Sequence, residues 1–248
     1  MSGHSKWSTI KRKKGANDAK RGKLFAKLIR AIEVAAKKGG TDPANNASLY
    51  QAISKAKSMS VPNNNIDNAL KRLSGQQDSD DFEEVFYEGY GPHGVAILVD
   101  CLTDNRNRTS SDVKSTFSKY NGSTGAPGSV NYLFERKAIF QFDSTSDELI
   151  NLAIENSCLE FIENNSGITF EFNPQDFKKV NEVFQSSKYE SNISEVAYVP
   201  ATPVMIDLDQ FKQVANLIEA LEDLDDIQNV YTNFDIDEKL LDLSLIHI

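Results

Sequence analysis

The sequence predicts a multi-domain α+β protein, in which an N-terminal three-helix domain is followed by two ferredoxin-like α+β domains, one inserted in the other. Apolar residues recur with the period of a helix between residues 18 and 75. After an acidic stretch at residues 76–81, the pattern changes to short apolar runs that are typical of strands. Residues 137–199 then follow the order β-α-β-β-α-β, which is the ferredoxin-like arrangement.

Three short amphipathic helices are expected before the acidic stretch. The first covers residues 18–38 and ends at Gly39-Gly40. The second is expected to open at Thr41-Asp42-Pro43, with a cap followed by proline, and the third at Val61-Pro62. None of them can bury its apolar stripe alone, so we expect a small bundle. The apolar face of the first helix contains Leu24, Phe25, Leu28, Ile29, Ile32, Ala35 and Ala36.

The remaining chain is expected to form two α+β domains. Strands are predicted at residues 82–87 and 95–102, with a helix at about 110–120. Two strands and one helix make a poor core. We therefore expect the last elements, at residues 204–206, 209–221 and 227–234, to complete that sheet. The inserted domain is predicted to contain strands at 137–142, 159–163, 168–172 and 193–199, and helices at 147–156 and 174–186. The predicted domains are residues 1–77, residues 78–134 plus 203–240, and residues 135–202.

Charge is distributed very unevenly along the chain. Residues 1–40 contain twelve Lys or Arg residues and two acidic residues, a net charge of +10, although the whole chain carries −9. The other 208 residues therefore carry −19. This asymmetry indicates a polyanionic partner for the basic segment.

Nucleic acid is the polyanion that the basic segment fits best. Residues 2–15 are expected to form a mobile arm, in which Trp7 is exposed among lysines and can stack on a base. Lysines dominate the basic residues, which favours contacts with phosphate over reading of base edges. The alternative is a lysine-rich face that is merely solvated. The candidate nucleic-acid-binding residues are Lys6, Trp7, Lys11, Arg12, Lys13, Lys14, Lys20, Arg21, Lys23, Lys27, Arg30 and Lys37.

A second candidate site lies between a predicted buried strand and the helix that follows it. Arg106 and Arg108 stand there beside a helix start at which Thr109 or Ser110 can act as the cap. One interpretation is a contact with phosphate or with an acidic peptide. The other is that both arginines pair with carboxylates of their own domain. The sequence leaves both open.

Motifs typical of enzymes are scarce. Residues 89–94 match the GxGxxG spacing, but a strand follows where a dinucleotide site needs a helix, so a tight hairpin turn is expected. The acidic run at residues 219–226 is expected to be a solvated helix face. His4, His93 and His247 have no partner at metal-ligand spacing. We therefore expect no enzymatic activity, cofactor, metal or small-molecule substrate.

Cellular location is suggested by composition. Cys101 and Cys158 are not in CxxC spacing, which favours a reducing compartment. The chain contains no apolar run of membrane-spanning length, and residues 1–14 lack the apolar face of a mitochondrial transit peptide. A cytoplasmic protein without membrane contact is expected.

Several stretches together resemble the YebC/PmpR family, which includes the mitochondrial translational activator of cytochrome oxidase. The resemblance extends from residue 2 to about residue 236, with His93 in place of the family's usual glycine and Asn131-Tyr132 where tryptophan is common. The matching stretches are Gly3-His4-Ser5-Lys6-Trp7, Asp18-Ala19-Lys20-Arg21-Gly22-Lys23, Val34-Ala35-Ala36-Lys37, Gly40-Thr41-Asp42-Pro43, Tyr87-Glu88-Gly89-Tyr90-Gly91-Pro92, residues 102–109, Gly128-Ser129-Val130 and residues 221–231.

The resemblance implies a three-domain, non-enzymatic regulator, and it leaves two roles open. Bacterial members are commonly described as DNA-binding transcriptional regulators. Other members look like ribosome-associated factors that assist translation, including that of proline-rich stretches. In that second role the basic segment would bind ribosomal RNA, and the acidic domains could face basic ribosomal proteins. A protein-interaction scaffold with a solvated basic arm is a third alternative.

Overall fold

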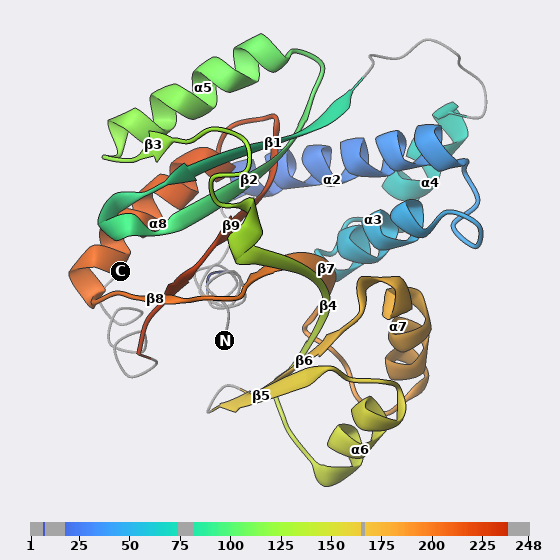
Figure 1. The fold of residues 1–248 in the computed structure, drawn as a ribbon. Helices are drawn as coiled ribbons and strands as arrows, with labels where there is room; N and C mark the ends of the chain where they lie inside the picture. The colour runs from blue at the N-terminus through green and yellow to red at the C-terminus, as the bar shows by residue number, and fades with distance from the viewer. Residues whose placement is uncertain (1–6, 8–17, 74–81, 165–166, 238–248) are drawn as a thin grey trace. The chain divides into compact units, whose positions relative to one another are not determined.

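The structure is a computed structural model that describes residues 7, 18–73, 82–164 and 167–237 (Figure 1). Contacts divide the chain into two compact units. Unit 1 comprises Met1–Lys23, Asp80–Glu135 and Tyr198–Ile248, and unit 2 comprises Leu24–Ser79 and Arg136–Ala197. The three predicted helices thus share a compact unit with most of the predicted inserted domain. The division into three domains at residues 77, 134 and 202 stays a prediction.

Three amphipathic helices form within residues 18–73, as the sequence predicted: α2 (Asp18–Gly39), α3 (Ala47–Ser58) and α4 (Asn63–Leu73). Unit 2 contains them from Leu24 onward, and the first turns of α2 belong to unit 1. Their apolar stripes meet in one core. It is built from Leu28, Ile32, Ala36, Leu49, Ala56, Val61 and Ile66.

The predicted start of the second helix is wrong. Asn46 caps α3 by accepting a hydrogen bond from the backbone N–H of Leu49 at 3.1 Å, whereas Asp42 closes a separate turn by accepting from the N–H of Ala44 at 2.9 Å. The Asn46 amide also donates to the carbonyls of Ala35 and Gly40, at 2.8 and 2.9 Å. A Cβ atom at Gly39 would lie 2.7 Å from this amide, so only glycine leaves room for it.

The second part of unit 2 has the predicted ferredoxin-like order. Its elements are β4 (Phe134–Phe142), α6 (Asp147–Glu155), β5 (Glu160–Asn164), β6 (Gly167–Phe172), α7 (Phe177–Ser186) and β7 (Ile193–Pro200), with a 3-10 turn, η3 (Pro174–Asp176), before α7. The sheet order is β5-β6-β4-β7, and both helices contribute to an aromatic core with Phe140, Phe170 and Phe184 (Figure 1).

Helix α3 packs against α7 within unit 2. The Tyr50 ring meets Phe177 edge-on, with 6.2 Å between ring centroids, and its hydroxyl accepts a hydrogen bond from the buried Asn181 amide at 3.0 Å. Lys55 forms an ion pair with Glu195 at 3.0 Å. These contacts join the three helices to the ferredoxin-like part.

Unit 1 is built on a sheet of order β3-β1-β2-β9. Its elements are β1 (Glu83–Tyr90), η1 (Pro92–Gly94), β2 (Ala96–Thr103), α5 (Arg106–Lys119), β3 (Ser123–Thr124), η2 (Asn131–Leu133), β8 (Val204–Met205), α8 (Leu208–Glu222), β9 (Ile227–Thr232) and β10 (Phe234–Asp235). Residues of α5 and α8 share a core with Ile97, Val99 and Cys101 of β2. The late strand β9 pairs with β2, which confirms that the end of the chain completes this sheet. Strands β8 and β10 instead form a separate parallel pair.

The glycine-rich stretch at residues 89–94 is a hairpin turn, as predicted. Strands β1 and β2 are antiparallel, and the N–H of Gly91 donates to the carbonyl of Val95 at 2.8 Å. His93 has a φ of 63°, in the left-handed region that favours glycine. This explains why glycine suits that position. No helix follows the glycines, so the stretch lacks the geometry of a dinucleotide site.

Candidate nucleic-acid interface

Helix α2 presents its basic residues in two different environments. Arg21, Lys23 and Lys37 are exposed, whereas Lys27 and Arg30 are partly buried. Val34, one turn further along the side that carries Lys27 and Arg30, is buried. The lysine-rich face is therefore not uniformly exposed, and the exposed residues lie toward the two ends of the helix.

Part of the predicted binding set cannot be placed. Lys6, Lys11, Arg12, Lys13 and Lys14 lie outside the described residues, as does the side chain of Lys20.

Trp7 does not lie where the sequence predicted. Its side chain is only 4% exposed and belongs to the core of unit 1, together with residues of β2, α5 and α8. The indole Nε1 donates to the Glu222 carboxylate at 3.2 Å. The expectation of an exposed ring is wrong, because the polar local sequence says nothing about a distant apolar pocket that can take up a lone aromatic residue.

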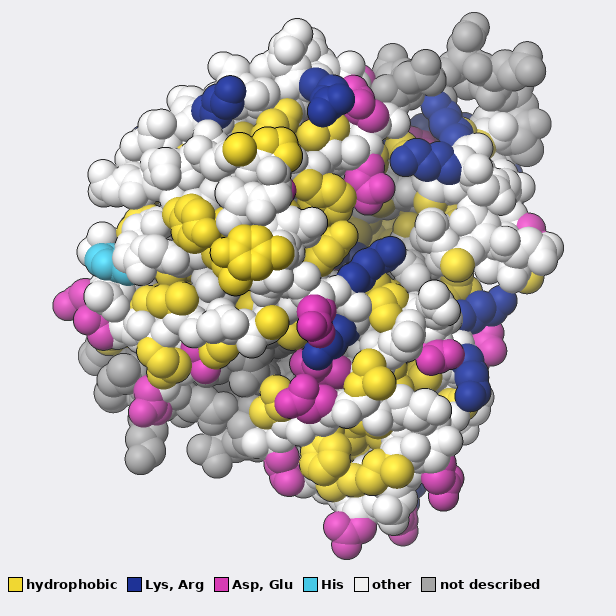
Figure 2. Space-filling view, in the orientation of Figure 1, with side chains coloured by type: hydrophobic (Ala, Val, Ile, Leu, Met, Phe, Trp, Pro, Cys, Tyr) yellow, Lys and Arg dark blue, Asp and Glu magenta, His cyan; other side chains and the backbone are white. Residues whose placement is uncertain are grey.

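The described residues keep the charge separation seen in the sequence. Residues 18–73 carry a net charge of +7, and the described part of unit 1 at residues 82–135 and 198–237 carries −11. On the face shown in Figure 2, Lys and Arg side chains are separated by polar and acidic side chains and do not form one continuous patch.

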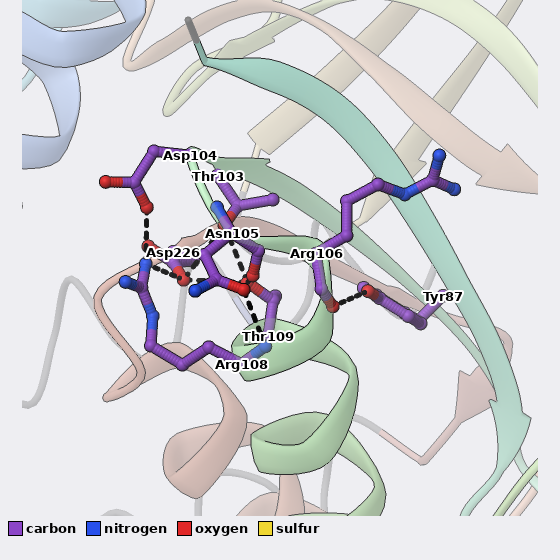
Figure 3. Close-up of polar contacts among 8 residues, drawn as sticks. All are labelled: Tyr87, Thr103, Asp104, Asn105, Arg106, Arg108, Thr109 and Asp226. Atoms are coloured by element: carbon purple, nitrogen blue, oxygen red, sulfur yellow. Dashed lines mark hydrogen bonds and ion pairs between the residues drawn. The ribbon is translucent and has the colours of Figure 1, made fainter. Parts of the chain in front are cut away.

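The segment between β2 and α5 is held by a buried carboxylate (Figure 3). Asp226 accepts hydrogen bonds from Arg108 at 2.7 Å, from the Thr109 hydroxyl at 2.7 Å and from the Thr103 hydroxyl at 3.2 Å. Arg108 also pairs with Asp104 at 2.8 Å. Of the two interpretations for this segment, pairing with carboxylates of its own domain is what the structure shows for Arg108.

Burial alone would raise the pKa of Asp226, but the hydrogen bonds from Arg108 and Thr109, together with the Arg108 charge, lower it below its ordinary value. The prediction of a wholly solvated acidic run at residues 219–226 is therefore wrong for Asp226. This residue follows the end of α8 and turns inward.

The predicted start of α5 is also wrong. The helix begins at Arg106, and Asn105 is the cap that accepts from the Arg108 N–H at 3.1 Å, because an Asn side chain can reach the free N–H groups of the first turn. Thr109 is buried, with its hydroxyl used within the cluster. Arg106 lies 3.6 Å from Glu83, and both side chains are largely exposed. Of the three residues proposed as an anion contact, Thr109 is buried, Arg108 is exposed but bound to two carboxylates, and Arg106 is exposed with one long ion pair.

Glu88 is a structural anchor that the sequence analysis missed. Its buried carboxylate accepts three backbone hydrogen bonds, from Gly128 at 2.6 Å, Val130 at 2.7 Å and Asn131 at 2.8 Å. Burial acts to raise the pKa of Glu88, but these hydrogen bonds outweigh it and lower the pKa. One signal was available: Glu88 lies between two aromatic residues, Phe86 and Tyr90, on one face of a strand, and Gly128-Ser129-Val130 matches a family motif.

Within residues 7, 18–73, 82–164 and 167–237, no group of three or more His, Cys, Asp or Glu side chains is placed to hold a metal ion. In the same part of the chain, no helix combines the length and apolar character needed to cross a membrane.

The fold and the charge distribution define a multi-domain α+β protein with a basic helical region at residues 18–73 and an acidic region at residues 82–135 and 198–237. Comparisons with known proteins agree with this class. Sequence models described as "TACO1/YebC protein N-terminal domain" and "TACO1/YebC second and third domain" match residues 5–76 and 82–234. The chain therefore belongs to the TACO1/YebC family, which confirms the resemblance.

Full-length relatives carry a regulatory name. Proteins named "Probable transcriptional regulatory protein" from Beutenbergia cavernae and Salinispora arenicola are 47% and 48% identical to this chain, each covering 97% of it and 98% of the relative. A crystal structure of a conserved hypothetical protein from Aquifex aeolicus is 40% identical, with a TM-score of 0.78, and the match covers 89% of this chain and 93% of that one. The names of the two relatives from Beutenbergia cavernae and Salinispora arenicola support a regulatory role for the family.

Proposed function

We propose that this protein is a non-enzymatic cytoplasmic regulator that binds the phosphate backbone of nucleic acid through the exposed basic residues of α2 and the basic N-terminal segment. The observation that carries the proposal is the exposure of Arg21, Lys23 and Lys37 on a region of net charge +7, in a chain that is otherwise strongly acidic. The relatives' name favours DNA as the target and transcription as the process.

Ribosomal RNA is the second candidate target. Helix α2 contains no Asn or Gln in its 22 residues, so it offers few of the side chains that commonly read base edges. Residues 82–135 and 198–237 of unit 1, at −11, would repel a second nucleic-acid surface and would suit basic ribosomal proteins. These features favour a partner that is recognised by shape and charge over a specific DNA sequence.

A pair of matched variants tests the proposal. Arg21, Lys23 and Lys37 are replaced together by Ala, and in the control the exposed residues Lys114, Lys119 and Lys212 of unit 1 are replaced instead. We expect the first variant to bind a labelled oligonucleotide roughly tenfold or more weakly at low salt, because three phosphate contacts are lost. The control should bind like the wild type. Equal losses in both variants would refute a role for α2.

The target is distinguished by two measurements on the wild type. Salt-sensitive sedimentation with ribosomes would favour ribosomal RNA. Preference for a promoter fragment over random DNA by about a thousandfold would favour a specific transcriptional regulator.

A further inference from the structure

We propose that the acidic end of α8 is a docking surface for the chain's own N-terminal segment, and that nucleic acid competes with this internal contact. The acidic end of α8 is defined here as Glu219, Glu222, Asp223 and Asp225. The inference rests on the proposed function, since it assigns a regulation to the same basic segment. Both sides of the contact belong to unit 1.

Trp7 provides the apolar half of the contact. Its ring is almost completely buried in a core that includes Phe117 of α5 and Leu217 and Leu221 of α8. Its N–H finds a carboxylate partner in Glu222, at 3.2 Å. A buried indole with a satisfied N–H is a well-formed anchor and fixes this residue against the last turn of α8.

Lys23 provides the charged half. Its ammonium lies 3.4 Å from the Asp225 carboxylate, just beyond the end of α8. Both side chains are exposed, so salt weakens the pair and another anion can replace Asp225. The C-terminal end of a helix also carries partial negative charge, which favours a cation at this place.

These two residues cannot serve the internal contact and nucleic acid at the same time. A ring that is 4% exposed cannot stack on a base, and a phosphate bound at Lys23 would be placed next to the Asp225 carboxylate. The carboxylates at the acidic end of α8 therefore occupy the position that phosphates of a polyanion would otherwise take. The docked arrangement is one state of Trp7 and Lys23, and the arrangement with nucleic acid bound is another.

Docking of Trp7 and Lys23 should lower the affinity for nucleic acid. If nucleic acid binds the undocked form, its apparent affinity is reduced by the fraction of molecules that are docked. Weakening the internal contact should then increase the affinity for nucleic acid. Binding should also expose Trp7.

Trp7 reports on its own position, because it is the single tryptophan of the chain. We expect the free protein to show blue-shifted emission and weak quenching by acrylamide. Inorganic polyphosphate, which has no bases that could stack on an indole, should shift the emission to longer wavelength and increase the quenching constant. Unchanged emission and quenching at saturating polyphosphate would overturn the proposal.

Variants test the surface itself. Replacing Glu222 and Asp225 by Ala should increase acrylamide quenching of the free protein and tighten oligonucleotide binding by about 3- to 10-fold. The matched control replaces Asp112 and Asp209, two exposed carboxylates of unit 1, by Ala and removes the same charge. Equal tightening in the two variants would show a general charge effect and contradict the proposal.

Failure of this inference and failure of the proposed function give different results. Oligonucleotide binding is followed independently by fluorescence anisotropy of a labelled strand. If the strand binds while Trp7 stays buried, the docking surface is wrong and the proposed function stands. If no nucleic acid binds, the proposed function is wrong, and so is the proposed competition between nucleic acid and the internal contact.

Discussion

Two carboxylates of unit 1 and three basic residues of α2 lie in opposite environments. In unit 1, Glu88 and Asp226 are buried carboxylates whose oxygens are occupied by N–H and hydroxyl donors. On α2, Arg21, Lys23 and Lys37 are exposed. Buried charges with satisfied hydrogen bonds fix a structure, whereas charges at the surface stay accessible to a partner. Charge alone therefore does not locate a binding site. Burial decides which charges a partner can reach.

The largest expected effect on stability comes from Glu88. Replacing it by Gln puts an N–H₂ group among three N–H donors, and we expect a loss of about 2–4 kcal/mol in the free energy of unfolding. Urea unfolding followed by circular dichroism measures it. Oligonucleotide affinity of the folded variant should not change. A stable variant with weaker binding would reverse the assignment of structural and binding charges.

A somewhat smaller loss in the free energy of unfolding is expected when Asp226 is replaced. Asp226→Asn removes the charge that Arg108 and Thr109 contact, which should lower the free energy of unfolding by about 1–3 kcal/mol. The same urea titration applies. Stability equal to that of the wild type would show that the cluster in Figure 3 does not hold β2 and α5 together.

Acid should weaken unit 1 in a defined pH range. Glu88 and Asp226 both have a pKa in the folded protein below the ordinary values of 4.5 and 3.8. Each therefore contributes stability that is complete above its ordinary pKa and is lost as the pH falls through the lowered one. Thermal unfolding between pH 6 and pH 2.5 should show the wild type losing stability below about pH 4.5. Glu88→Gln should show a shallower loss over that range, and parallel curves would contradict the role of this carboxylate.

Arg106 should have the smallest effect on stability. Its ion pair with Glu83 is long and exposed, so Arg106→Ala should not change the unfolding midpoint measurably. Arg106→Ala also tests whether Arg106 contacts phosphate, as the second candidate site predicted. Oligonucleotide binding should be unchanged, and a clear loss of affinity would restore the phosphate-contact interpretation for this residue.

Local patterns predicted most of the fold. Helical periodicity located α2, α3 and α4, and the alternation of elements from residue 137 onward predicted the ferredoxin-like order of unit 2. The errors concern long-range contacts. Asn46 and Asn105 cap helices in preference to the hydroxyl or Asp-Pro signals nearby, because their side chains reach the free N–H groups in the folded chain.

The candidate site was predicted less completely than the fold. Trp7 is surrounded in sequence by polar and basic residues, and only the folded chain shows the pocket that buries it. Asp226 is one of several adjacent acidic residues, and nothing in the local sequence distinguishes the one that turns inward to meet Arg108. In each case the deciding contact joins residues more than a hundred positions apart.

The central claim is that exposed basic residues on α2 bind phosphate, and the salt dependence of binding tests it most directly. For the wild type, contact with six to ten phosphates predicts an affinity that falls about a thousandfold or more between 50 and 200 mM salt. Replacing Arg21, Lys23 and Lys37 by Ala should lower the slope of log affinity against log salt by about 2–3, whereas replacing Lys114, Lys119 and Lys212 should not change it. A slope that is the same in all three proteins would contradict the claim.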